Sequence, residues 1–200
     1  MEQTSGGLGA QVSTPETAVR YRIDSRASRF TVKVTATGLF SAMGHNPTIA
    51  IRDSEGEATF VPATLDGASV RVTLLPDSFE VTDDISHKDR LEIEKTMKQD
   101  VLETFRYPQI SFESTGVSPT KIGDERYAVS VAGNLNLHGM TRPETIICQV
   151  SVMGETLRAS GEFSIRQTNY GIKLVSVAGG TLKVKDELKC SFEIVARRQE

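Results

Sequence analysis

The chain has 200 residues, of which 24% are charged and 38% are hydrophobic. This balance is typical of one globular domain with a sizeable core. The formal net charge of −3 gives no electrostatic case for binding nucleic acid or an anionic membrane surface. No apolar run approaches the roughly 20 residues that span a bilayer as a helix.

The N-terminal stretch, residues 1–18, is rich in Gly, Ser and Thr. It has neither the basic segment nor the continuous apolar segment of a secretory signal. We therefore expect residues 1–18 to form a flexible tail, residues 19–200 to form one domain, and the protein to be cytoplasmic.

Strand patterns dominate the chain from residue 20 onward, because apolar and polar residues alternate with a period of two. Such alternation predicts strands with one buried face, as in an antiparallel sheet, rather than a buried parallel sheet. Short turn sequences at 54–57 (SEGE), 65–68 (LDGA), 153–156 (MGET) and 184–187 (VKDE) favour hairpin connections. The alternating segments are Phe30–Thr37, Val70–Leu74, Ile110–Ser114, Tyr127–Leu137, Ile146–Val152, Leu157–Ile165 and Leu188–Ala196.

One segment, residues 86–108, has helical character instead. It is rich in helix formers and places Ile93, Met97 and Val101 at four-residue spacing. Ser86 with Asp89 resembles a capping box, and a proline at position 108 ends the segment. We predict one helix, or two short ones, inserted between strands.

The two cysteines, Cys148 and Cys190, are far apart and have no C-x-x-C spacing. This indicates neither a disulfide framework nor a zinc site. Each falls on the apolar phase of a strand segment, so we predict two buried free thiols.

About eight antiparallel strands with one apolar face each are expected to close into a barrel, which hides those faces and removes the sheet edges. Small residues on the inward phase (Ala36, Ala132 or Gly133, Ala159, Gly161) leave room inside, which favours a ligand cavity. A sandwich with a filled core remains an alternative.

Four sequence motifs occur in order along this all-β pattern: YRID at 21–24, YPQISFES at 107–114, GNLNLHGMTRP at 133–143 and FSIRQTNYGI at 163–172. In this order and spacing, roughly residues 20–197 resemble the YceI-like family of polyisoprenoid-binding proteins. The resemblance implies a lipocalin-like antiparallel barrel that holds an isoprenoid chain. It also implies that the protein is a possible homodimer, and family members are often exported.

The sequence departs from the usual family pattern at several positions. Ala27 and Ala36 stand where the family often has histidines, and Gln167 stands where an arginine is expected, with Arg166 one place earlier. The segment GLFSAMGHNPTIAI at 38–51 resembles a sub-branch with a Gly-His-Asn turn. These changes leave the barrel pattern intact, but they affect which head group the ligand is expected to have.

The candidate site has an apolar wall and a polar mouth. We predict that His45, Arg166 and Asn169 lie at the mouth near a ligand head group. The apolar wall is predicted to include Phe30, Val32, Val34, Phe112, Val129, Val131, Phe163, Ile165 and Phe192.

No catalytic residue, metal site or cofactor is expected, because the three histidines lack metal-ligand spacing and no nucleophile motif occurs. We therefore predict a protein that binds, stores or transports a long-chain isoprenoid lipid, a polyprenyl compound or an isoprenoid quinone. The alternative is a small-molecule or metal-dependent enzyme in which the histidines cluster on the same barrel. A weaker third option is a structural or stress protein with a filled barrel and no ligand.

Overall fold

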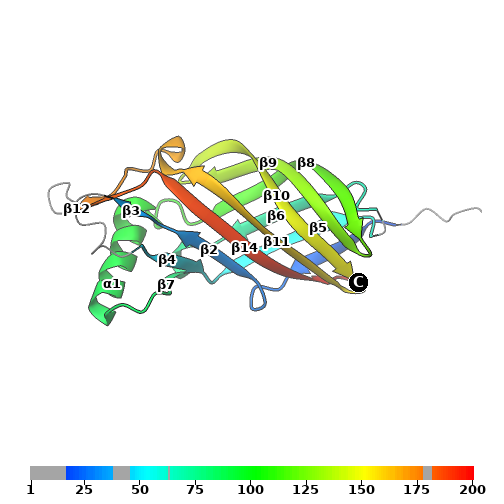
Figure 1. Cartoon of the computed structure of the whole chain (residues 1–200), viewed down its shortest axis with the longest axis horizontal. Helices are drawn as coiled ribbons and strands as arrows, with labels where there is room; N and C mark the ends of the chain where they lie inside the picture. Colours follow the sequence, from blue (N-terminus) through cyan, green and yellow to red (C-terminus); the bar gives the residue numbers. More distant parts are fainter. Residues whose placement is uncertain (1–16, 38–45, 63, 178–181) are drawn as a thin grey trace, which may run out of the picture.

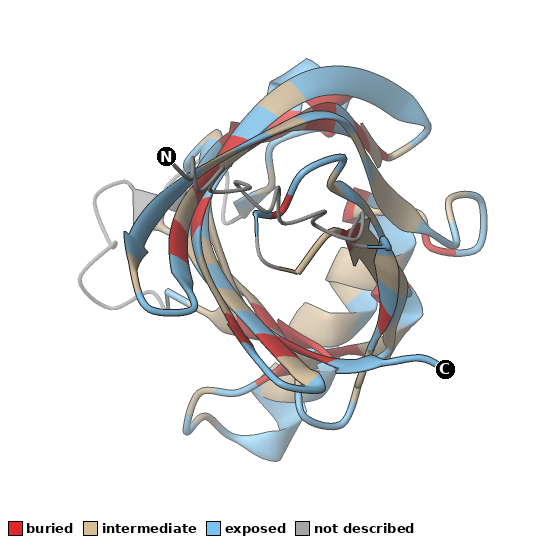
Figure 2. Cartoon of the chain, turned by 90° about the vertical axis from the view of Figure 1, so that its right-hand side faces the viewer, coloured by how far each residue is buried: buried red, intermediate tan, exposed pale blue. Residues whose placement is uncertain are grey.

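The computed structural model describes residues 17–37, 46–62, 64–177 and 182–200. Antiparallel strands form a closed ring, because β1 pairs with β14. Figure 1 shows the long strands β8–β11 along one side, and Figure 2 looks down the ring. The ring confirms the predicted antiparallel barrel of about eight strands. Its order is β1 (Val19–Ile23), β5 (Ser54–Phe60), β6 (Ser69–Leu74), β8 (Ile110–Gly123), β9 (Arg126–Leu137), β10 (Met140–Met153), β11 (Thr156–Arg166) and β14 (Glu187–Arg198).

Three of the ring strands are interrupted and continue as second, shorter strands. β1 is followed by β2 (Arg29–Lys33), β5 is preceded by β4 (Thr48–Ile51), and β6 is followed by β7 (Phe79–Val81). β2 pairs with β14, β4 with β2, and β7 with β4. The sheet therefore extends past the ring at one end and stops at β7.

A small second sheet lies at this same end, next to helix α1 in Figure 1. It consists of β12 (Ser176–Val177), β13 (Leu182–Val184) and β3 (Ala36–Thr37), with β13 in the middle.

At two of these interruptions, a serine side chain forms hydrogen bonds with nearby backbone groups. Ser28 Oγ accepts from Val195 N–H (3.0 Å) and donates to the carbonyl of Val195 (3.2 Å). Ser78 Oγ accepts from the N–H groups of Arg52 (3.2 Å) and Asp53 (2.9 Å). Ser28 thereby supplies partners to the part-buried backbone groups of Val195. Ser78 ties the exposed backbone of Arg52 and Asp53 to the segment before β7.

The predicted turn at 54–57 is wrong, because those residues lie within β5 and the interruption falls at Arg52–Asp53. The backbone turns at Arg52–Asp53 because two contacts hold it against the 3₁₀ turn η1 (Pro76–Ser78). Ser78 Oγ bonds to the Asp53 N–H, and the Asp53 carbonyl accepts from the Leu75 N–H (3.0 Å). The predicted turns at 65–68 and 153–156 are confirmed. The hairpin predicted at 184–187 is wrong, because this bend joins β13 to β14, which lie in different sheets.

The helical insert is confirmed as helix α1 (His87–Thr96) followed by a π-helical turn, η2 (Met97–Val101). Ser86 caps the helix, since its hydroxyl accepts from Asp89 N–H (3.1 Å) and donates to the Asp89 carboxylate (2.7 Å). Helical conformation ends before the proline at position 108, because Glu103 adopts a left-handed backbone conformation (φ 46°).

The inward-facing glycines do not leave empty space. A Cβ added to Gly133 would lie 2.4 Å from Phe112 Cζ, and one added to Gly161 would lie 2.8 Å from Phe192 Cζ. Each Phe ring thus covers a neighbouring glycine, an arrangement that stabilises strands containing glycine. The expectation that these glycines create room is therefore wrong, whereas Ala159 does line the interior.

Candidate ligand-binding site: an apolar lumen

The barrel encloses a cavity of about 280 Å³ that runs along its interior. Its walls reach from Leu65 and Leu157 at one end to Met97 and Val101 at the other. All nine residues predicted for the apolar wall line it, and their contact with a ligand stays a prediction: Phe30, Val32, Val34, Phe112, Val129, Val131, Phe163, Ile165 and Phe192.

The lining carries almost no charge. Among the described residues it contains no lysine, arginine or histidine, and its one acidic residue, Glu57, pairs with Arg20 at 3.6 Å on the solvent side. A lumen of this composition is suited to an uncharged hydrocarbon ligand, because an isolated charge inside it would be strongly desolvated.

Gln167 is the buried polar side chain of the lining, with 4% of its surface exposed. It begins the 3₁₀ turn η3 (Gln167–Tyr170), and its Nε2 donates to the carbonyl of Lys185 (2.9 Å). Because that carbonyl only accepts, the orientation of the amide is fixed, with Oε1 as its second polar atom. Sequence reasoning placed the polar group one residue earlier, although Gln167 follows Phe163 and Ile165 on the same inward phase.

The two cysteines are free thiols, as predicted, and both line the lumen. Cys148 is buried, as predicted, whereas Cys190 is half-buried. Burial raises the pKa of Cys148 to about 11 and the pKa of Cys190 to about 12. Both thiols are therefore protonated near neutral pH and add apolar, weakly nucleophilic surface to the wall.

One end of the lumen, which we call the closed end, is sealed by aromatic packing. Tyr21 is fully buried, stacks on Phe60 with ring centroids 5.0 Å apart, and donates its hydroxyl to the carbonyl of Gly154 (3.0 Å). Leu65 adopts a left-handed conformation (φ 61°), and its buried side chain packs with Tyr127 in the same cluster. Burial, the largest effect, raises the pKa of Tyr21.

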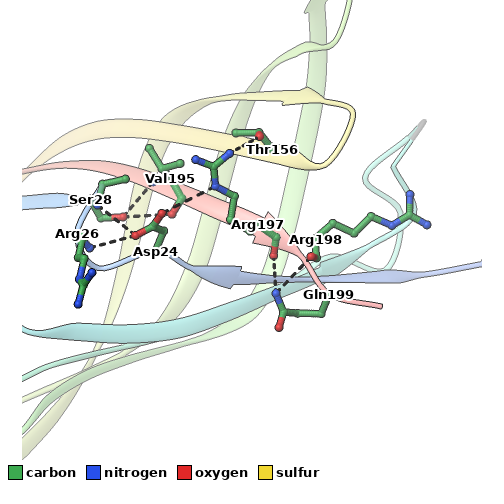
Figure 3. A network of polar contacts seen from close by, with 9 residues as sticks. Asp24, Arg26, Ser28, Thr156, Val195, Arg197, Arg198 and Gln199 are labelled. Atoms are coloured by element: carbon green, nitrogen blue, oxygen red, sulfur yellow. Dashed lines mark hydrogen bonds and ion pairs between the residues drawn. The ribbon is translucent and has the colours of Figure 1, made fainter.

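Polar contacts hold the strands together at this end of the barrel (Figure 3). Arg197 approaches Asp24 (3.8 Å) and donates to the Thr156 hydroxyl (2.9 Å), which joins β14 to β1 and β11. The Asp24 carboxylate also accepts from the N–H groups of Arg26 (3.2 Å) and Ala27 (3.3 Å) at the turn after β1. The closed end thus combines a buried aromatic plug with a polar outer layer.

The opposite end, which we call the lid end, is covered by α1 and η2. β7 is an edge strand with no further strand beside it among the described residues, and α1 packs next to it. The Glu94 carboxylate accepts from the edge N–H of Val81 (2.9 Å) in place of a neighbouring strand. No residue of α1 is buried. The apolar cover comes from Met97, Val101 and Leu102, all of which line the lumen.

A second cluster fixes the chain that follows η2. The His138 ring packs against Tyr107 with centroids 4.4 Å apart, and its Nδ1 lies 3.3 Å from the carbonyl of Tyr170. His138 Nε2 lies 3.7 Å from Glu103 Oε1. Tyr170 is fully buried and donates to Glu144 (2.8 Å); burial and then this hydrogen bond raise its pKa. The turn at 138–139 therefore anchors the segment that joins the lid to β8.

Two of the three residues predicted for the polar mouth, Arg166 and Asn169, do not line the lumen. Both residues are exposed, and the Asn169 carbonyl accepts from Arg142 Nε (3.1 Å). Both point to solvent because they alternate with Gln167 and Tyr170, which are buried. His45 lies outside the described residues. Head-group contact by these three residues stays a prediction.

The described residues include no group of three or more His, Cys, Asp and Glu side chains that would hold a metal ion. His87 is the exposed first residue of α1, and the described neighbours of His138 are Tyr107, Tyr170 and Glu103. No observation favours the enzyme alternative. Over the ranges that the structure describes, no helix has the length and apolar character to cross a membrane.

Solved structures with the same fold share little sequence with this chain. Burkholderia cenocepacia BcnA has 19% identity and a TM-score of 0.65, with 86% of this chain and 98% of that chain covered. A polyisoprenoid binding domain from Saccharophagus degradans, implicated in plant cell wall breakdown, has 14% identity and a TM-score of 0.64, with 90% and 99% covered. The Campylobacter jejuni YceI protein has 15% identity and a TM-score of 0.58, with 76% and 85% covered. At these identities the likeness shows the fold.

A search of curated protein sequences gave no match. The sequence profile of the YceI-like domain, in contrast, matches residues 21–196, from Tyr21 in β1 to Ala196 in β14. This match spans most of the chain and agrees with the barrel described above. The chain therefore belongs to the YceI-like domain family.

Proposed function

We propose that this protein binds one long-chain isoprenoid lipid, a polyprenyl compound or an isoprenoid quinone, in the barrel lumen. The observation that carries the proposal is the chemistry of the lumen: an interior cavity of about 280 Å³ whose wall is apolar along its length. The polyisoprenoid binding domain with the same fold supports the choice of lipid.

The free-energy balance favours a long chain over a short one. Each buried CH₂ group contributes about 0.8 kcal/mol, and association costs about 4–15 kcal/mol. Several isoprene units are therefore needed before net binding appears. The role that follows is binding, storage or transport of the lipid rather than catalysis, with no cofactor beyond the lipid itself.

Two features of the wall support a non-covalent complex. The protonated thiols of Cys148 and Cys190 are poor nucleophiles, so an electrophilic quinone would not be captured as a thioether. Gln167 offers the buried amide through which a neutral head group is hydrogen-bonded. Homodimer formation, which the family resemblance implies, stays a prediction for size-exclusion chromatography with light scattering.

Native mass spectrometry of freshly purified protein, followed by organic extraction, tests the proposal. We expect one lipid per chain and an extracted compound with a prenyl chain. If the protein is empty, we expect it to take up one molecule of an added long polyprenol. A protein that is empty and also fails to take up the polyprenol contradicts the proposal.

A further inference from the structure

The chain segment after η2 presents one large apolar side chain to solvent. Phe105 is fully exposed, at 103% of the reference surface. Its neighbours are fixed inward: Thr104 is buried and donates to Asp77 (3.3 Å), and Tyr107 packs against His138. The backbone turn that begins at Glu103, whose carbonyl accepts from the N–H groups of Arg106 and Tyr107, therefore holds Phe105 outward.

Cationic side chains surround Phe105. Lys95 and Lys98 of the lid and Arg106 line the same shallow hollow as Phe105. Neither lysine forms an ion pair with the described residues, whereas Arg106 lies 3.6 Å from Glu103 and Asp77 accepts from the Thr104 hydroxyl. Three cationic side chains and two carboxylates line the hollow, so its formal charge is positive by one, although the chain as a whole carries −3.

The hollow lies beside the end of the sheet extension. Among the described residues the extension stops at β7, and Met97, Val101 and Leu102 cover the lumen next to it. Within the part of the chain that the structure describes, a lipid that enters or leaves here displaces these side chains and breaks no strand pairing. A π-helical turn such as η2 is itself a frequent feature of functional segments.

We propose that Phe105, Lys95 and Lys98 form a docking surface for an anionic lipid bilayer, and that the lid beside it is the portal through which the lipid cargo passes. This inference rests on the proposed function, because a cargo insoluble in water is drawn from a membrane. An exposed aromatic ring next to lysines matches the apolar and headgroup layers of a bilayer surface. Such local attraction acts within about a Debye length of 8 Å, so it does not depend on the net charge of the chain.

The test uses full-length protein and phosphatidylcholine vesicles with or without phosphatidylglycerol. Vesicle binding is measured by flotation, and uptake of a fluorescent long polyprenol is measured from vesicles and, separately, from ethanol solution. We expect binding to the anionic vesicles that weakens as salt is raised. Phe105→Ser is expected to reduce this binding about tenfold, and Lys95→Glu with Lys98→Glu at least about tenfold.

Two variants serve as matched controls. Ile147→Ser removes an exposed apolar side chain (69% exposed) from the outer face of β10, and Lys121→Glu reverses an exposed charge at the far end of β8. We expect both to bind vesicles like the unchanged protein. All variants are expected to take up polyprenol from ethanol equally well, which shows that they are folded and that the lumen is intact.

Three results overturn the proposal. The first is no binding to either kind of vesicle, and the second is an equal loss of binding in Phe105→Ser and Ile147→Ser. The third is an equal loss of uptake from vesicles and from ethanol in Phe105→Ser. Failure of the proposed function has a different signature. In that case the protein binds anionic vesicles through Phe105 and takes up polyprenol from neither source.

Discussion

The two ends of this barrel are closed by different means. At the closed end, Tyr21 and Phe60 stack inside the ring, and strand pairing continues around them. At the lid end, the described part of the sheet ends at β7, and a helix with no buried residue of its own packs beside it. The closed end is thus held by core packing, whereas the lid end is held by three apolar side chains and a few hydrogen bonds. Regions with few buried contacts open at low free-energy cost, so we expect the lid end to open locally while the closed end opens only when the protein unfolds.

The largest expected effect is at the closed end. Tyr21→Ala removes a fully buried ring and its stack on Phe60 and is expected to lower the free energy of unfolding by about 3–5 kcal/mol. Tyr21→Phe keeps the ring and loses only the hydrogen bond to Gly154, which costs about 1 kcal/mol. Urea denaturation of the two variants measures both values. Similar small decreases in the free energy of unfolding in both variants would show that the stacked Tyr21 and Phe60 rings do not stabilise this end.

An alkaline titration probes Cys148 within the closed-end cluster. Its pKa is raised from 9.0 to about 11 in the folded protein, so the unfolded chain loses this proton first. The stabilisation from the neutral thiol is complete below pH 9 and is lost as the pH rises through about 11, up to about 2–3 kcal/mol.

The matched control is Cys148→Ala, which lacks the thiol and retains every other group that titrates in this range. The difference in unfolding free energy between the unchanged protein and this variant should shrink from pH 8.5 to pH 11. A constant difference over that range would mean that the thiol is already solvated in the folded state.

Thiol labelling compares the two ends within one molecule, because Cys190 packs with the lid-end cluster and Cys148 with the closed-end cluster. Cys148→Ala leaves Cys190 to react, and Cys190→Ala leaves Cys148. We expect an uncharged thiol reagent to label Cys190 at least about tenfold faster, corresponding to about 1.4 kcal/mol less opening free energy. Rates are normalised to those of the unfolded variants. Equal rates would indicate that both ends open in one global event.

The smallest expected effect concerns the edge of β7. Glu94→Ala removes the acceptor of the Val81 N–H and is expected to cost about 1 kcal/mol. Glu94→Gln keeps an acceptor oxygen and should cost less. Hydrogen exchange of the Val81 amide, monitored by NMR, is the direct readout, and it should accelerate in the alanine variant alone. An unchanged exchange rate of the Val81 amide in both variants would mean that other contacts hold the lid in place.

The alternation of apolar residues was sufficient to predict the barrel, the inward face of each long strand and the burial of Cys148, because a strand with a period of two has one dry face. It did not predict the interruptions of three strands. Those depend on long-range partners: Ser28 bonds to Val195, and Ser78 bonds to residues 52 and 53. Nor did it predict that Phe112 and Phe192 cover Gly133 and Gly161, since small inward residues show only that space is available.

The part of the candidate site that lies on strands was predictable from the alternation of apolar and polar residues. The part that lies in loops was not. The apolar wall followed from the strand pattern. At the mouth, the chain leaves β11 for the turn η3, and the alternation continues just far enough to turn Gln167 inward and Arg166 outward. The lid contacts of Met97, Val101 and Leu102 depend on how the insert docks on the barrel, which its weak helical periodicity does not specify.

The central claim, that the lumen is where the lipid binds, is tested most directly by filling it. Ala159 faces the cavity between Val150 and Ile194 on the adjacent strands, and the next residue, Ser160, faces solvent. We would titrate Ala159→Phe and Ser160→Phe with a long polyprenol, after confirming by circular dichroism and urea unfolding that both are folded. The account predicts binding of one molecule to Ser160→Phe, as to the unchanged protein, and at least about tenfold weaker binding to Ala159→Phe. Equal affinity in both variants would contradict it and place the lipid outside the barrel.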